Sequence, residues 1–164
     1  MRFAPAAAAL SLLLATTASV TSAQDRDPDP RAAALIAQGQ ASLKAGDTQA
    51  AIDAYEAALA VDPGYTPIFL ELADAARQDG LQGKAIRYYR EALSRDPGNF
   101  AAISGEGAAL VEKGALEKAK LNLARLKSLC GSNCPETLSL QTTIAAGPPA
   151  RLAAETDESG PASN

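Results

Sequence analysis

The sequence contains no histidine and no tryptophan, and aromatic residues make up only 4% of its 164 residues. Without histidine, the chain cannot build a Ser-His-Asp or Cys-His catalytic centre, a histidine-ligated metal site or a histidine-ligated haem. Apolar residues nevertheless account for 47% of the sequence, and many of them are alanine. That composition favours close packing of helices over a sheet core, which is usually rich in valine, isoleucine and aromatic residues.

The charged residues and the motifs restrict the function further. The sequence has 15 Lys and Arg residues against 19 Asp and Glu residues, and the net charge of −4 argues against general binding of nucleic acids. We find no glycine-rich phosphate loop, nucleophile elbow or metal-binding motif, and no pair of carboxylates in a recognisable catalytic arrangement. The sequence therefore predicts a protein that is not an enzyme and that uses no cofactor or metal.

Residues 1–23 have the pattern of a secretory signal peptide. Arg2 supplies a positive charge, an apolar run extends from Ala6 to Leu14, and small residues lead to a cleavage site after Ala23. Because the run is shorter than the ~20 residues that cross a bilayer, we expect cleavage rather than anchoring, and no stable membrane insertion elsewhere. The alanine-rich signal suggests a small exported bacterial protein of the periplasm.

The centre of the chain repeats with a period of about 34 residues. Glycine, alanine, tyrosine, isoleucine and an Asp-Pro-Gly turn all recur at this spacing. The matching positions are Gly46, Gly80 and Gly114; Ala51, Ala85 and Ala119; Tyr55 and Tyr89; Ile52 and Ile86; and Asp62-Pro63-Gly64 and Asp96-Pro97-Gly98. Self-similarity at a fixed period of this length indicates stacked helical units, and the alternative is a generic bundle of helical hairpins.

Each period is predicted to contain two helices. The first spans 32–45 and ends at Gly46, which tolerates a left-handed backbone. Asp47 is placed to cap the second helix by accepting from its free N–H groups. Pro63 ends that helix because proline disfavours helical backbone in the residue before it. Thr66-Pro67 then begins the next helix, with threonine as the cap and proline at the first helical position.

This arrangement resembles the tetratricopeptide repeat family, in which small residues mark the first helix, an Ala-x3-aromatic pattern marks the second and a proline closes the repeat. The residues that carry the resemblance are Leu35, Gly39, Ala51, Tyr55, Ala58 and Pro63 in repeat 32–65, and Phe69, Leu72, Ala73, Ala85, Tyr89, Ala92 and Pro97 in repeat 66–99. A third repeat, 100–133, is divergent, since Leu123 replaces the aromatic residue.

The resemblance implies an all-α fold. It would be a right-handed superhelical solenoid of about three helix-turn-helix units, with Tyr55 and Tyr89 wedged between neighbouring units. We expect a further helix at 135–146 to cap the end of the solenoid. The acidic leader at 24–31 and the tail at 147–164, which is rich in Pro, Ala, Gly and acidic residues, are predicted to be disordered.

The resemblance also implies a binding groove lined by the first helix of each repeat, which would hold a peptide or helix of a partner protein. The corresponding positions are Ile36, Gln40, Leu43, Lys44, Leu70, Glu71, Asp74, Arg77, Ser104, Ala108 and Val111. Chaperone-binding members clamp a C-terminal carboxylate with Lys and Asn; since Ile36 and Gln40 stand at those first-repeat positions, we do not expect that ligand. The simplest interpretation of Asp74 and Arg77 is a solvated or mutually paired couple.

Cys130 and Cys134 are the only cysteines. In an exported protein they most simply form one structural disulfide across a helix end. The sequence thus predicts a non-enzymatic scaffold or adaptor that binds a protein partner. Two alternatives stay open: a thiol-redox or metal-handling accessory that uses the cysteine pair, and a structural protein that self-associates through an uncovered N-terminal helix face around Leu35.

Overall fold

The computed structural model describes residues 26–149 of the chain. In this range the structure consists of seven α-helices joined by short turns, without strands. They are α1 (Pro30–Lys44), α2 (Thr48–Val61), α3 (Pro67–Gln78), α4 (Gln82–Arg95), α5 (Phe100–Glu112), α6 (Leu116–Cys130) and α7 (Pro135–Ala146). None of the seven is long and apolar enough to span a membrane. The predicted signal peptide and the tail beyond residue 149 lie outside the described residues.

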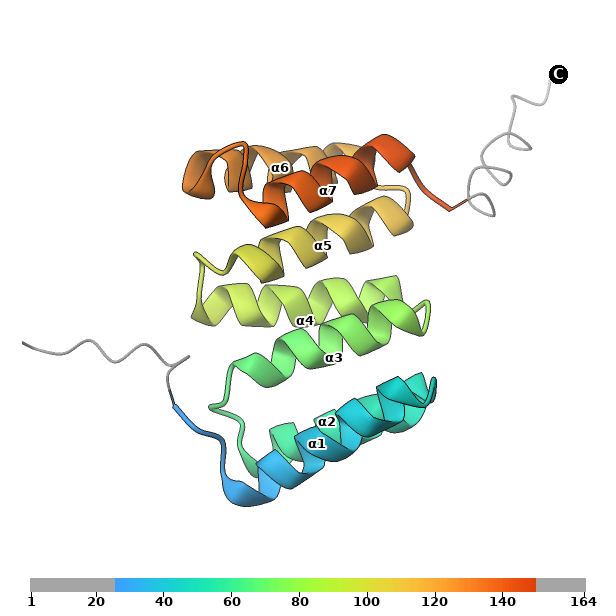
Figure 1. Cartoon of the computed structure of the whole chain (residues 1–164), viewed down its shortest axis with the longest axis vertical. Helices are drawn as coiled ribbons and strands as arrows, with labels where there is room; N and C mark the ends of the chain where they lie inside the picture. The colour runs from blue at the N-terminus through green and yellow to red at the C-terminus, as the bar shows by residue number, and fades with distance from the viewer. Residues whose placement is uncertain (1–25, 150–164) are drawn as a thin grey trace, which may run out of the picture.

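The helices stack in hairpins, α1 with α2, α3 with α4 and α5 with α6, and α7 closes the stack (Figure 1). The expectation of an all-α helical solenoid is therefore confirmed. The hairpin turns contain the glycines that recur once in each repeat period: Gly46, Gly80 and Gly114 have φ angles of 81°, 75° and 81°. These angles lie in the left-handed region, which glycine adopts without a steric penalty, so the repeat of glycines follows from the repeat of turns.

Helix starts follow the predicted chemistry at one position and depart from it at another. The Asp47 carboxylate accepts from the backbone N–H of Ala50 at 3.0 Å and caps α2. Pro67 is the first residue of α3, as expected, but the Thr66 side chain makes no capping hydrogen bond. The Thr66 backbone is itself helical (φ −55°, ψ −37°), whereas a capping side chain needs an extended backbone to reach the free N–H groups.

Two tyrosines pack directly against glycines in the core. Tyr55 and Tyr89 are 0% and 1% exposed. A Cβ atom on Gly39 would lie 2.5 Å from the ring of Tyr55, and one on Gly105 would lie 2.3 Å from the ring of Tyr89. Glycine is therefore required at both positions. Tyr89 reaches the next repeat at Gly105 and Tyr55 reaches it through a hydrogen bond to Glu71, so the expectation that these tyrosines wedge between neighbouring units is confirmed.

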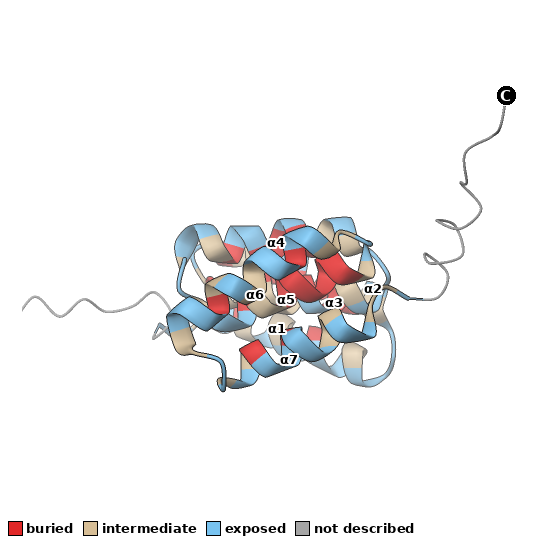
Figure 2. Cartoon of the chain, turned by 90° about the horizontal axis from the view of Figure 1, so that it is seen from above, coloured by how far each residue is buried: buried red, intermediate tan, exposed pale blue. Residues whose placement is uncertain are grey.

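Helix α7 covers the end of the stack over the range expected for the capping helix. Its fully buried Leu140 packs with Ile103 of α5 and Leu126 of α6 in a small apolar cluster. The opposite side of α7 is exposed, as the view from above shows (Figure 2). Helix α7 thus covers an apolar face of the last hairpin, α5 and α6, which three repeats alone would leave exposed.

The leader is ordered from residue 26 onward, contrary to the expected disorder over 24–31. The Arg26 guanidinium donates to the Asp62 carboxylate at 2.7 Å, and the backbone N–H of Asp29 donates to the same group at 3.0 Å. Asp29 also caps α1, which begins at Pro30 rather than at residue 32. The composition of this segment concealed these contacts because Asp62, their shared partner, lies at the far end of the first repeat.

Candidate functional site

A cavity of about 310 Å³ opens between α3, α5 and α7. We call it the terminal cavity, since residues of α7 line it and α7 is the last helix along the chain. Small and polar side chains form most of its wall. Its lining residues are Asp74 and Arg77 of α3; Ala101, Ser104, Gly105 and Ala108 of α5; and Pro135, Glu136, Ser139 and Thr143 of α7.

Four of the eleven predicted groove residues line this cavity. Asp74, Arg77, Ser104 and Ala108 come together there, as neighbouring first helices require. The remaining predicted residues of α1 and α3 lie outside the cavity. Ile36, Leu43 and Leu70 are half-buried against the main core, Glu71 is half-buried, and Gln40 and Lys44 are exposed. Leu35, which was expected to be uncovered at the N-terminal end, also packs against the core.

The assignment of Val111 to the groove is wrong. Val111 is only 1% exposed and belongs to the main hydrophobic core. Its helix, α5, is buried along most of its length because α4, α6 and α7 all pack against it. Val111 therefore faces the core rather than a ligand.

Asp74 and Arg77 do not pair with each other, which was one of the two expected arrangements, although Asp74 is exposed to solvent as the other one requires. The Arg77 Nε atom lies 3.2 Å from Oε1 of Glu112 on α5, and the Asp74 carboxylate accepts a hydrogen bond from the hydroxyl of Tyr89. Burial raises the pKa of Glu112, and the nearby Arg77 opposes that shift only in part. Each residue of the expected pair therefore binds a partner on a neighbouring helix, which a pattern confined to one helix cannot reveal.

Glu71 has a similar role one turn before Asp74. Its carboxylate accepts from the hydroxyl of Tyr55 at 3.1 Å. Burial is the largest cause that raises the pKa of both phenols. The neighbouring carboxylate raises it further, Glu71 for Tyr55 and Asp74 for Tyr89. Both tyrosines consequently remain neutral donors, and they hold two acidic side chains of α3 in place.

The contribution of α7 to the cavity was not predicted. Pro135, Glu136, Ser139 and Thr143 supply one wall, although this helix was expected only to cap the stack. The repeat period contains the missing signal, because Pro67, Ala101 and Pro135 stand one period apart, in the first turns of α3, α5 and α7. Helix α7 therefore has the register of a first helix, and first helices were the ones expected to line the groove.

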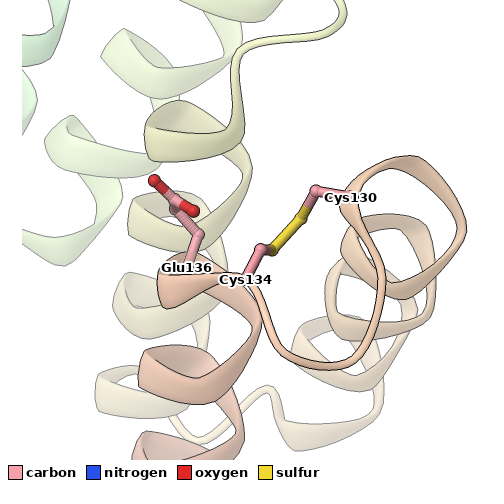
Figure 3. A group of neighbouring side chains, drawn as sticks. All are labelled: Cys130, Cys134 and Glu136. Carbon is pink, nitrogen blue, oxygen red and sulfur yellow. A yellow bond between two sulfur atoms is a disulfide. The ribbon is translucent and has the colours of Figure 1, made fainter.

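Cys130 and Cys134 join the end of α6 to the start of α7 (Figure 3). Their sulfur atoms form a disulfide, and their Cα atoms are 5.9 Å apart. The fully buried Thr137 hydroxyl lies 3.0 Å from the Cys134 sulfur and donates to the carbonyl of Gly131 at 2.9 Å. The loop thereby positions the first turn of α7, which includes the cavity residues Pro135 and Glu136.

The same loop was the candidate for metal handling. A carboxylate oxygen of Glu136 and the two sulfur atoms lie within 4.8 Å of one another. However, sulfur atoms that are bonded to each other present no thiolate to a metal ion. In Figure 3 the Glu136 carboxylate extends away from the sulfur atoms, toward the neighbouring helix. The arrangement suits a structural link better than a ligand set.

The basic side chains of α4 and α6 are largely engaged within the fold. Lys84 pairs with Glu56 at 2.7 Å, Arg90 with the buried Glu106 at 2.7 Å, and Lys120 with Glu117 at 2.6 Å. The Lys84 contact, with the Tyr88 hydroxyl, holds the pKa of Glu56 below its usual range. Much of the positive charge on this surface is therefore matched by carboxylates of the same chain.

Comparisons with known proteins agree with this architecture. The sequence matches the tetratricopeptide repeat family over residues 6–66 and again over 36–100, which together exceed half of the chain. No curated protein matches the sequence significantly. The solved structures that resemble the chain include tetratricopeptide repeat domains and a secretion chaperone.

Three structures illustrate the similarity. The first tetratricopeptide repeat domain of Spaghetti (RPAP3), bound to the HSP90 peptide SRMEEVD, is 26% identical and covers 71% of this chain and 92% of its own, with a TM-score of 0.62. The Sgt2 tetratricopeptide repeat domain from Aspergillus fumigatus is 24% identical and covers 84% of this chain and 89% of its own, with a TM-score of 0.65. The Yersinia enterocolitica type III secretion chaperone SycD, in complex with a peptide of the translocator YopD, is 21% identical. It covers 78% of this chain and 94% of its own, with a TM-score of 0.60.

Fold and cavity together define a helical-repeat protein of the kind that binds other proteins. The chain belongs to the tetratricopeptide repeat family. Domains of this family are protein-interaction scaffolds and are generally non-enzymatic. The family resemblance stated from the sequence is thereby confirmed.

Proposed function

We propose that this protein is a non-enzymatic adaptor that binds an extended segment of a partner protein in the terminal cavity and along α3 and α5. The observation that carries the proposal is the cavity itself, which three successive first-position helices form and which small residues leave open. Spaghetti (RPAP3) and SycD, both similar in fold, are each described in complex with a peptide, which supports a peptide segment as the ligand of this chain.

Site-specific photocrosslinking tests this proposal. A benzophenone amino acid replaces Ala101, which lines the cavity and is exposed, or Ala57, which is exposed on α2 and serves as the control. We expect one dominant protein adduct in cells from position 101 and none from position 57. Equal adduct patterns at the two positions would contradict the proposal.

A blocking substitution shows whether that adduct depends on the cavity. Ser104→Arg places a long side chain into the cavity, and Ser94→Arg makes the same change on α4, away from the cavity. The adduct from position 101 should disappear with Ser104→Arg and persist with Ser94→Arg. Circular dichroism of both variants controls for folding.

We further propose that the protein is exported to the periplasm and that Cys130 and Cys134 form a structural disulfide there. The signal-like pattern of residues 1–23 and the pairing of the two sulfur atoms support this location, since disulfides persist in oxidising compartments. The intact mass of protein recovered from cells tests it. We expect loss of residues 1–23 and no free thiol, and a full-length mass with two free thiols would contradict both parts.

A further inference from the structure

The free charge of the terminal cavity is negative. Three charged side chains line it, Asp74, Arg77 and Glu136. The Arg77 guanidinium is matched by Glu112, which lies outside the lining and 3.2 Å away. Asp74 and Glu136 stand on different helices, α3 and α7, and neither has a cationic partner among residues 26–149.

Two of the three hydroxyl groups in the cavity lining already donate their hydrogen to a backbone carbonyl. The Ser104 hydroxyl donates to the carbonyl of Glu136 at 3.2 Å, and the Thr143 hydroxyl donates to the carbonyl of Ser139 at 3.0 Å. A hydroxyl that donates keeps lone pairs that can accept. The carboxylates are acceptors only, and the Asp74 carboxylate has capacity beyond the bond from Tyr89. Apart from the Arg77 guanidinium and the Ser139 hydroxyl, the cavity side chains therefore offer acceptors to a ligand.

Small residues leave room for a long side chain. Ala101, Gly105 and Ala108 of α5 supply part of the lining, and the ring of Tyr89 excludes any side chain at position 105. The resulting volume of about 310 Å³ is large enough for one extended side chain. Lysine and arginine side chains are positively charged, and their polar groups are hydrogen-bond donors without acceptors. Their aliphatic stems are long enough to enter the cavity.

We propose that the terminal cavity receives a lysine or arginine side chain of the partner segment, with Asp74 and Glu136 as its counter-charges on opposite walls. This inference rests on the proposed function. It sets the chain apart from Spaghetti (RPAP3), whose bound peptide SRMEEVD contains three acidic residues. An acidic segment meets like charges in the cavity of this chain, and like-charge contact disfavours a partner.

Selection of peptides from a phage-displayed library of random decapeptides tests the inference. The bait is the full chain, and the variant Asp74→Asn with Glu136→Gln is the comparison. Both substitutions keep the size and an accepting oxygen, so that the hydrogen bond from Tyr89 is retained. Asp53→Asn is the matched control, because Asp53 is exposed on α2, where it accepts from Gln49 at 2.8 Å.

We expect the selected peptides to share one Lys or Arg and to bind the double variant at least about tenfold more weakly, with less than a twofold change for Asp53→Asn. Replacing the shared basic residue of the peptide by norleucine should weaken binding to the parent chain by a similar factor. The same replacement should hardly change binding to the double variant. Selected peptides without a shared basic residue, blocked by Ser104→Arg, would overturn this inference and leave the proposed function standing. Failure to select any peptide that Ser104→Arg blocks would overturn both.

Discussion

The hydroxyl of Tyr89 on α4 donates a hydrogen bond to the carboxylate of Asp74 on α3. Tyr55, which stands one repeat period earlier, donates to Glu71 of the same helix. Two equivalent tyrosines of the solenoid thus reach α3 from α2 and from α4 and orient two carboxylates that lie one helical turn apart. Packing between repeats and the charge of the proposed binding surface depend on the same two side chains.

The tyrosine hydroxyls can be tested by removing them singly. Tyr89→Phe leaves the ring in place and deletes the bond to Asp74, and we expect it to lower the free energy of unfolding by about 1 kcal/mol. Tyr55→Phe deletes the equivalent bond to Glu71, at 3.1 Å, and should cost about as much. Urea unfolding followed by circular dichroism measures both. Unchanged stability in both variants would contradict this prediction.

Glycine at position 105 is predicted to be essential for stability. A Cβ atom there would lie 2.3 Å from two ring atoms of Tyr89, so that Gly105→Ala forces packed helices apart and costs at least ~1–3 kcal/mol. Gly83→Ala is the control, because its Cβ would meet only Lys113 Nζ at 3.7 Å. That change should be neutral or stabilise the protein by up to ~1 kcal/mol, since alanine favours helix over glycine. Thermal unfolding of the two variants should move in opposite directions or differ by several degrees.

The link between Cys130 and Cys134 should stabilise the end of the solenoid. For so short a closed loop, the loss of chain entropy in the unfolded state predicts about 2 kcal/mol. The double variant Cys130→Ser, Cys134→Ser should therefore unfold at lower urea concentration, and dithiothreitol should have the same effect on the parent chain and none on the variant. Identical unfolding curves with and without dithiothreitol would show that no disulfide forms.

The contacts of Asp62 predict a dependence of stability on pH. The Arg26 guanidinium, with a backbone N–H, holds the pKa of Asp62 below its usual range. A lowered pKa in the folded state means that the stabilising effect is complete above the unfolded value of about 3.9 and is lost as the pH falls through the folded value. Asp62→Asn should therefore lower stability at neutral pH, and its difference from the parent chain should shrink below pH ~4.

A second variant checks that Arg26 is the cause. Arg26→Gln removes the largest cause of the lowered Asp62 pKa. The difference in the free energy of unfolding between this variant and the parent chain should also shrink in acid. Urea unfolding across the acid range measures both variants. A stability difference that stays constant down to the lowest pH would contradict the assignment.

The sequence predicted the fold far better than it predicted the site. The glycine turns, the capping Asp47, the wedged tyrosines and the helix at 135–146 all follow from local chemistry that recurs in each repeat. The partners of Arg77 and Asp74 do not, because they lie on α5 and α4, and the packing of α5 decides that Val111 is buried. Asp62 likewise gains its partner from the leader, whose composition alone suggested disorder.

The register of α7 has a consequence for the length of the solenoid. This helix begins at Pro135, two repeat periods after Pro67, and it packs as the first half of a repeat whose second half is absent from residues 26–149. Leu138, on its outward side, is 49% exposed, where a second helix would otherwise cover it. The stack is therefore open to modular extension: consensus repeats grafted after Ala146 would find a helix already in phase, and each would lengthen the row of first helices available to a partner.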